Sequence, residues 1–401
     1  MANNLLTWIH LSDLHMESAD SFNRKVVLDA LWKDIKRLID GGLQPDFIAF
    51  TGDTAFHGLP EEYKLAQELF FEPLLAITTL PKDRLFVVPG NHDVNRRRTE
   101  LIGNPLPSLR SEDDIRKVLE SDDKREVFTS PLAGYRSFED SYLDVNMGKT
   151  SLVSPSSNRI VVGEWKISIV TLNSAWLSGF NRNAAGEIDD CAHLAIGELQ
   201  VRNAFASDAE THFHIVLVHH PFDWLLEFDR FVVKELIARE RSLVLHGHLH
   251  RPDAQLTSTL AGELITVPAG SVFDNRHLPN AYNLVQVDLK TGSGTIYFRR
   301  YNDRRGEWQK DLDSTGEVLD GRVQFKLPAS WRLWQTGDVA PEKETRRVTD
   351  YSCIFTKDCK REMKSLGLSE SDVLERAAQM WSLFLSLIRV EPNLSARSTK
   401  S

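Results

Sequence analysis

The sequence predicts an α/β protein in which buried strands alternate with helices. Short apolar runs alternate with segments whose apolar residues recur at helical spacing, starting within the first residues. Further along, several strand-like runs follow one another closely, which predicts a second and more antiparallel sheet. The composition, with 41% hydrophobic and 26% charged residues, is that of an ordinary globular protein.

The first part of the chain repeats a strand followed by a helix. The helix over Asn23–Asp40 is indicated by apolar residues at helical spacing, and Gly41 and Gly42 provide its stop. The runs Leu6–Leu11, Asp46–Thr51 and Arg84–Val88 read as strands, with a second helix over Glu61–Thr79.

Residues 94–157 interrupt this alternation. They are polar, with helical patterns at Glu112–Glu120 and Leu132–Leu143, and Ser, Asn and Pro gather near 154–158. We interpret them as a cap-like insertion over the site. Beyond it the pattern predicts helices at Ala195–Ser207 and Asp229–Arg239, and strands at Ile160–Val162, Ile167–Leu172, Phe213–Val218, Leu243–Leu245, Ala254–Leu260, Glu263–Pro268, Tyr282–Asp288 and Thr295–Tyr301.

The end of the chain has a different character. Residues 306–392 form a predicted C-terminal extension that carries an amphipathic helix over 369–388, and residues 393–401 form a predicted disordered tail. This helix would pack against the main domain, bind a protein partner or mediate self-association.

Bulk properties narrow the class of protein. No apolar run approaches the ~20 residues of a membrane span, and no secretory signal is present, so we expect no membrane partner. The three cysteines fit no zinc motif and indicate reduced thiols and a cytoplasmic location. The net charge of -9 argues against a protein that coats duplex DNA, although a local basic patch remains compatible with it.

Five short segments carry the chemistry, and each begins where a predicted strand ends. They are Ser12–His15, Gly52–Thr54, Gly90–Asp93, His219–Pro221 and Gly247–His250. Ligand sites in open α/β sheets form at the carboxyl ends of strands, so we expect these loops to meet in one crevice.

The residue types in these segments suit a site for two metal ions. Carboxylate oxygen and imidazole nitrogen bind Mn, Fe or Zn, and no thiolate is present to favour a soft-metal site. Asp13 and His15 are two residues apart, so on an extended segment their side chains would point the same way, and His248 and His250 repeat this spacing. Asp53 follows a glycine, and a single carboxylate can bridge two cations.

Together the five segments resemble the motifs of the calcineurin-like metallophosphoesterases, in order and over about residues 5–300. The resemblance implies a four-layer α-β-β-α sandwich of two mixed sheets, with a metallophosphoesterase domain over residues 1–305. It implies that Asp13, His15 and His250 bind one metal ion, and that Asn91, His219 and His248 bind the other. Asp53 would bridge both ions, while His92 would be a proton donor or charge stabiliser with Asp93 as a possible orienting partner.

Some assignments are less specific. His219 is preferred to its neighbour as the ligand because it directly follows the strand, and His220 would then line the substrate pocket. Arg96 and Asn173 are further candidates for substrate contacts, against the alternatives of a solvated basic turn and a plain strand end.

The expected reaction is hydrolysis of a phosphodiester by a metal-bound hydroxide at a centre holding two divalent ions. Among members of this family, the chain most resembles bacterial enzymes that cleave cyclic nucleotides or other small phosphodiesters. The alternatives are a nuclease, with a basic track at Arg96–Arg98, Arg299, Arg300, Arg304 and Arg305, and an effector module of a larger assembly docked through the C-terminal extension.

Overall fold

The computed structural model of the 401-residue chain describes residues 4–18, 22–143, 152, 157–206, 211–249, 255–259, 261–273, 279–312 and 319–331. They belong to one compact unit, Met1–Thr336. The predicted metal ligand His250, the predicted helix over 369–388 and the predicted tail over 393–401 lie outside the described residues. Within the described part of the chain, no helix combines the length and the apolar character needed to cross a membrane.

Two mixed β-sheets form the centre of this unit. The first has the order β12-β11-β10-β1-β2-β3, with β13 also paired to β11, and the second has the order β4-β5-β6-β7-β9-β8. The strands of the first sheet are β1 (Leu5–Leu11), β2 (Phe47–Phe50), β3 (Leu85–Val87), β10 (Ala281–Asp288), β11 (Ser293–Asn302), β12 (Glu307–Lys310) and β13 (Arg322–Lys326). Those of the second are β4 (Ser157–Val162), β5 (Trp165–Thr171), β6 (Phe213–Leu217), β7 (Ser242–His246), β8 (Gln255–Ser258) and β9 (Glu263–Pro268).

The expectation that the last four predicted strands form a separate antiparallel sheet is wrong. β9 lies parallel to β7 in the second sheet, whereas β10 lies antiparallel to β1 in the first. The chain between β9 and β10 crosses from one sheet to the other, and there Val272 N–H donates to the carbonyl of Ser12 (2.9 Å). Hydrophobic periodicity indicates that a segment is a strand, but it does not predict which strand pairs with it in a sheet.

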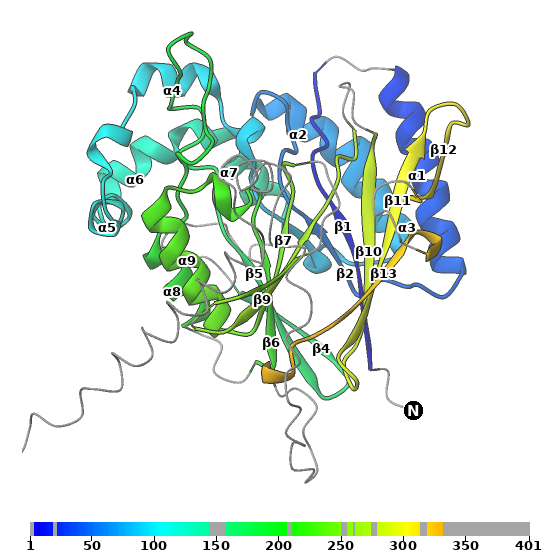
Figure 1. Cartoon of the computed structure of the whole chain (residues 1–401). Helices are drawn as coiled ribbons and strands as arrows, with labels where there is room; N and C mark the ends of the chain where they lie inside the picture. Colours follow the sequence, from blue (N-terminus) through cyan, green and yellow to red (C-terminus); the bar gives the residue numbers. More distant parts are fainter. Residues whose placement is uncertain are drawn as a thin grey trace, which may run out of the picture. The chain divides into compact units, whose positions relative to one another are not determined.

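The two sheets pack face to face and helices cover their outer faces, which gives the predicted four-layer sandwich. In β2, Phe47 and Ala49 point into a core shared by both sheets, while Ile48 and Phe50 point into the core under the helices. This alternation follows from the two-residue repeat of a strand. Figure 1 shows α1 and α3 along one side of the sheets and α8 and α9 along the other.

Each predicted helix within the described residues is present, although α4 and α6 were not predicted and one predicted helix is divided. The predicted helix over 61–79 is divided by a π-helical segment at Gln67–Phe71. The helices are α1 (Phe22–Asp40), α2 (Pro60–Ala66), α3 (Glu72–Thr78), α4 (Arg96–Ile102), α5 (Glu112–Glu120), α6 (Asp122–Thr129), α7 (Ala133–Tyr142), α8 (Glu198–Phe205) and α9 (Glu227–Arg239).

The insertion after residue 94 contains α4 to α7. Its last helix packs on α2 through stacked rings, with Phe138 5.3 Å from Tyr63 between ring centroids. Its first helix begins at Arg96, which lines a pocket at the carboxyl ends of the strands. The insertion is therefore joined to the sandwich and contributes to the pocket through its first residue.

The first sheet continues beyond residue 305, because β12 and β13 both pair with β11. The expected boundary at that position therefore falls within the sheet. Beneath β12, the buried side chain of Arg299 donates to both carboxylate oxygens of Asp34, with Nε 2.8 Å from Oδ2, and Tyr282 donates to the same carboxylate (2.7 Å). Arg299 is thus part of a buried ion pair and is not available to a basic track for nucleic acid.

Candidate metal centre

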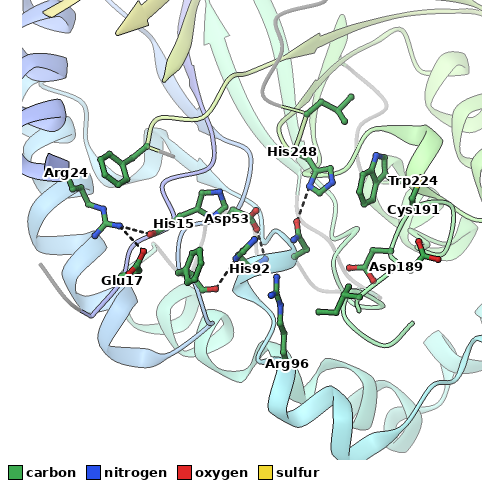
Figure 2. A pocket seen from close by; sticks show the side chains of 16 residues that line it. His15, Glu17, Arg24, Asp53, His92, Arg96, Asp189, Cys191, Trp224 and His248 are labelled. Carbon is green, nitrogen blue, oxygen red and sulfur yellow. Dashed lines mark hydrogen bonds and ion pairs between the residues drawn. The ribbon is translucent and has the colours of Figure 1, made fainter. Parts of the chain in front are cut away.

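The five sequence segments meet at one edge of the sandwich. Three of them follow β1, β2 and β3 of the first sheet, and the other two follow β6 and β7 of the second. They border a pocket of about 620 Å³ whose lining includes His15, Asp53, Asn91, His92 and His248. Figure 2 shows His15, Asp53, His92 and His248 gathered around the centre of the pocket. The convergence expected from the strand ends is present.

The backbone at this edge adopts a conformation that side chains rarely allow. Positive φ angles occur at Asp13 (57°), His15 (48°), Asp53 (56°) and His248 (69°). Such residues cost on the order of 1 kcal/mol or more each and persist where the surrounding structure enforces them. Asp13 and His15 therefore do not lie on an extended segment, as their spacing suggested; a left-handed turn brings both side chains to the site.

Two glycines permit the close approach of the loops. A Cβ atom on Gly52, which has a φ of +100°, would lie 2.5 Å from His219 Nδ1. A Cβ atom on Gly90 would lie 2.2 Å from Asp53 Oδ1. Glycine is needed at the start of these two segments because the side chain of a residue from another loop occupies the space beside it.

Asp53 lies at the centre of the cluster. Its Oδ1 accepts from the backbone N–H of His92 (2.7 Å), and its Oδ2 lies 3.3 Å from His219 Nε2. Possible ligand atoms of Asp53 gather with those of His15 and His92 in one group, and with those of Asp13 and His219 in another, within 4.8 Å in each group. One buried carboxylate is thus common to two groups of side chains whose types could hold a metal ion.

His219, Asn91 and His248 form the other side of the cluster. His219 Nδ1 donates to the carbonyl of Thr51 (2.6 Å), which leaves Nε2 directed at Asn91 Oδ1 (3.1 Å) and Asp53. Asn91 Oδ1 also lies 3.1 Å from His248 Nδ1. A backbone carbonyl that fixes the tautomer of an imidazole is a common second partner of a metal-binding histidine.

The charges at the centre fit a cation. Burial opposes ionisation of Asp53, yet His219, His92 and His15 outweigh it and hold the pKa of this carboxyl well below its usual range. Burial disfavours the charged form of His219, but Asp53 outweighs it and raises the pKa of His219 to about 9. Nε2 of His219 faces two oxygen acceptors, so a proton or a metal ion must lie between them. Divalent metals compete with protons for ligands of this kind.

His92 lies beside the cluster with one ring nitrogen committed to the protein. Nδ1 donates to the carbonyl of Phe56 (3.0 Å), and the ring lies 4.6 Å from that of His15 between centroids. Burial lowers the pKa of His92, against the opposing charge of Asp53. The ring is held firmly and its Nε2 remains for chemistry.

Asp93 does not orient His92, contrary to the expectation. Its carboxylate accepts from the backbone N–H groups of Ala55 (2.9 Å), Gly90 (2.9 Å) and Thr54 (3.2 Å), and from the hydroxyl of Tyr63 (2.9 Å). Burial and the charge of Asp53 raise its pKa to about 7. Asp93 therefore joins the loops after β2 and β3 and has a structural task.

The three predicted substrate residues have different surroundings. Arg96 is exposed and lines the pocket. Asn173 is buried outside it, and its side chain accepts from the backbone N–H of Ala175 (2.9 Å). His220 is fully buried behind Trp224, with Nδ1 2.8 Å from Ser174 Oγ, and does not line the pocket. The expectation of substrate contacts therefore fits Arg96 alone.

Several pocket residues were not anticipated from the sequence. They include the aromatic Trp224, whose ring centroid lies 4.0 Å from that of His248, and the carboxylate of Asp189. At the opposite end lie Arg24 and Glu17. Trp224 follows the histidine pair by four residues, which is a usable signal, but nothing in the sequence near Asp189 indicates a pocket.

Comparison with known proteins identifies relatives of this chain. A family model described as calcineurin-like phosphoesterase matches residues 6–252. An uncharacterized metallophosphoesterase-like protein of Bacillus subtilis is 21% identical over 325 residues, which make up 80% of this chain and 64% of that protein. A probable glycerophosphodiester phosphodiesterase of Arcobacter nitrofigilis is 32% identical over 87 residues, or 21% of this chain and 29% of that protein. A cAMP/cGMP dual specificity phosphodiesterase of Mycobacterium tuberculosis is 32% identical over 103 residues, or 25% of this chain and 31% of that protein. The chain thus spans less than two thirds of the length of each of these relatives.

Proposed function

Because the chain belongs to the calcineurin-like phosphoesterase family, which hydrolyses phosphate esters with divalent metal ions, we propose that it cleaves phosphodiesters at a centre for two such ions. The observation that supports this proposal most is the position of Asp53, whose carboxylate lies within 4.8 Å of possible ligand atoms of His15 and His92 in one group and of Asp13 and His219 in another. Asp13 and His15 would hold one ion together with His250. Asn91, His219 and His248 would hold the other ion, and Asp53 would contact both.

The ions would supply Lewis acidity toward the phosphate oxygens and lower the pKa of a bound water toward neutrality. Hydrogen bonds from outside the ligand set hold these side chains and loops in place. Thr51 orients His219, and Asp93 holds the loops after β2 and β3 together. The donor set of carboxylates, imidazoles and one amide suits Mn, Fe or Zn.

Two further side chains would act on the substrate. In its imidazolium form, His92 would donate a proton from Nε2 to the departing oxygen, because its Nδ1–H is held by the carbonyl of Phe56. Arg96 lies on the wall of the pocket beside His92 and would bind a non-bridging oxygen of the phosphate.

The preference for a diester rests on two arguments. The names of two relatives describe phosphodiesterases, for glycerophosphodiesters and for cyclic nucleotides. The pocket also extends to both sides of the metal cluster, toward Arg24 at one end and Trp224 at the other, so each substituent of a diester has its own space.

The test is turnover of bis-p-nitrophenyl phosphate and of p-nitrophenyl phosphate by protein loaded with Mn²⁺, with Asp53→Asn as the matched variant. We expect the diester to be preferred, and the neutral amide at position 53 to abolish turnover by weakening metal binding. A monoester preference would overturn the assignment of substrate. Turnover of the variant within about tenfold of the parent, with metal content unaltered, would overturn the central role of Asp53.

A further inference from the structure

The two ends of the pocket differ in what they offer a substrate. At one end, Arg24 donates to the carbonyl of His15 (2.9 Å) and lies 3.8 Å from the carboxylate of Glu17, with its guanidinium 4.7 Å from the ring centre of Phe273. The charges at this end are engaged within the protein. Arg24 and Glu17 line the pocket at this end, but their charged groups interact with the protein and leave few polar groups to bind a substrate.

The other end carries an aromatic face. Trp224 is half-buried and lines the pocket, with its ring set edge-on against His248 at 4.0 Å and stacked over His220 at 6.0 Å between centroids. Its backbone carbonyl accepts from the N–H of Leu194 (3.1 Å). The two histidines therefore hold the indole ring on one side. The hydrogen bond from Leu194, which follows Asp189 by five residues, holds the backbone of Trp224.

Asp189 supplies a carboxylate at the same end, as Figure 2 shows. Its backbone N–H donates to the carbonyl of Asn181 (3.1 Å), and its carbonyl accepts from the side-chain amide of Asn181 (2.9 Å). Across the part of the chain that the structure describes, no hydrogen bond or ion pair engages its carboxylate. The adjacent Asp190, by contrast, uses both oxygens on the N–H of Gly179 (2.9 and 3.1 Å). Asp189 is thus held by its backbone while its acceptor atoms remain available.

A flat aromatic face beside a carboxylate selects a planar ring that carries N–H donors. We infer that Trp224 and Asp189 form a subsite for the base of a nucleotide substrate, with a preference for bases whose edge presents two adjacent donors, as guanine does. This inference rests on the proposed phosphodiesterase activity. Trp224 supplies stacking, which every base accepts, and Asp189 supplies the discrimination, because a carboxylate can accept two parallel N–H groups. Ile188, Asp190, Cys191 and Leu249 are further residues of the pocket lining.

A quaternary ammonium group is the competing occupant, since it too is attracted to tryptophan and carboxylate. Its recognition characteristically uses a cage of several aromatic rings. Of the described lining residues, Trp224 is the one indole or phenyl ring at this end, since Phe56 packs on His92 and Phe273 on Arg24, and a single large ring suits a flat base better than a cage does.

The experiment uses the full chain loaded with Mn²⁺ and measures inhibition of methyl p-nitrophenyl phosphate hydrolysis by GMP, IMP, AMP, ribose 5-phosphate and phosphocholine. We expect GMP to bind about 100-fold more tightly than ribose 5-phosphate, with about tenfold from stacking on one aromatic ring and about tenfold from the carboxylate of Asp189. IMP, which lacks the amino group, should fall between them.

The variant Asp189→Asn should weaken GMP by about tenfold and change ribose 5-phosphate by less than about twofold, since only the base meets position 189. Glu187→Gln removes the same charge from an exposed position on the same loop, outside the pocket, and should change neither. For Trp224→Leu, we measure the ratio of the inhibition constants of GMP and ribose 5-phosphate, and we expect the advantage of GMP to shrink. The ratio is used because a disturbance of His248 by this substitution would change both inhibition constants alike.

The proposed base subsite would be refuted if Asp189→Asn left the ratio of the GMP and ribose 5-phosphate inhibition constants unchanged. It would also be refuted if phosphocholine bound more tightly than GMP. The proposed function fails in a different way, through absence of diester turnover in the parent protein. In that event, GMP binding to the Mn²⁺-loaded protein is measured by calorimetry, and the same variants still decide whether the base is recognised.

Discussion

The substitution Gly90→Ala tests the packing around Asp53 with a single methyl group. Gly90 has φ -112° and ψ -174°, which alanine adopts without strain. The added Cβ, however, would lie 2.2 Å from Asp53 Oδ1 and 2.5 Å from Asp53 N. An ordinary contact requires more than 3.4 Å, so Asp53 and the loop of Gly90 must separate by about 1 Å.

A displacement of this size at a catalytic centre lowers the rate by about 100-fold, or about 2.7 kcal/mol of transition-state stabilisation. We expect kcat/KM for bis-p-nitrophenyl phosphate to fall by at least this factor, with a parallel loss of bound Mn²⁺ after dialysis, measured by mass spectrometry. Circular dichroism establishes that the variant is folded.

Gly103→Ala is the control. Nothing lies within 4 Å of its added Cβ, but φ is +83°, so this change costs about 1 kcal/mol of folding stability and leaves activity intact. If Gly90→Ala instead kept kcat/KM within about threefold of the parent and bound its full metal content, the crowding of Asp53 would be refuted.

Three further predictions concern other parts of the molecule. His92→Ala should lower kcat by about 10²–10⁴-fold with metal content unchanged, and a loss of metal would instead make His92 a ligand. Asp34→Ala should cost about 3–5 kcal/mol of stability in calorimetry, because it leaves the buried Arg299 without its carboxylate; a loss below about 1 kcal/mol would contradict the buried ion pair. Burial and the charge of Glu112 raise the pKa of Asp229 well above its usual value, and burial raises that of Glu112 above 4.5. Because both groups hold protons more tightly in the folded state, stability should fall as pH rises from about 5 to 8. Glu112→Gln should flatten this decline in Tm, and equal slopes for parent and variant would count against the coupling of the two carboxyls.

Sequence periodicity predicted most elements of the fold but not their assembly. The segments Asn23–Asp40 and Glu112–Glu120 match α1 and α5, because their apolar stripes are long and regular. The short strands gave no indication of partner, so β9 and β10 were expected in one sheet although they lie in two. Strands β12 and β13 were missed, since their sequences are largely polar: Trp308 is the one buried residue of β12, and in β13 only Val323 and Phe325 are half-buried.

The candidate site was predicted better in its residue types than in its conformation. Asp13 and Asp53 carry chemistry that suits a metal, and their positions at strand ends could be inferred from the strands. Their left-handed backbone could not, because it depends on hydrogen bonds to other loops, such as that from Asp13 N–H to the carbonyl of Gly52 (2.9 Å). Asp93 was expected to orient His92, and Asn173 to contact substrate, because of their positions in the sequence. Their carboxylate and amide oxygens instead accept hydrogen bonds from backbone N–H groups.

The central claim is that Asp53 joins two metal ions within one cluster. The most direct measurement is electron paramagnetic resonance of the Mn²⁺-loaded protein, combined with metal analysis of the same sample. Two ions per chain with an exchange-coupled spectrum, replaced in Asp53→Asn by uncoupled Mn²⁺ or by loss of metal, is the predicted result. A single uncoupled Mn²⁺ per chain in the parent protein, or none, would contradict the account.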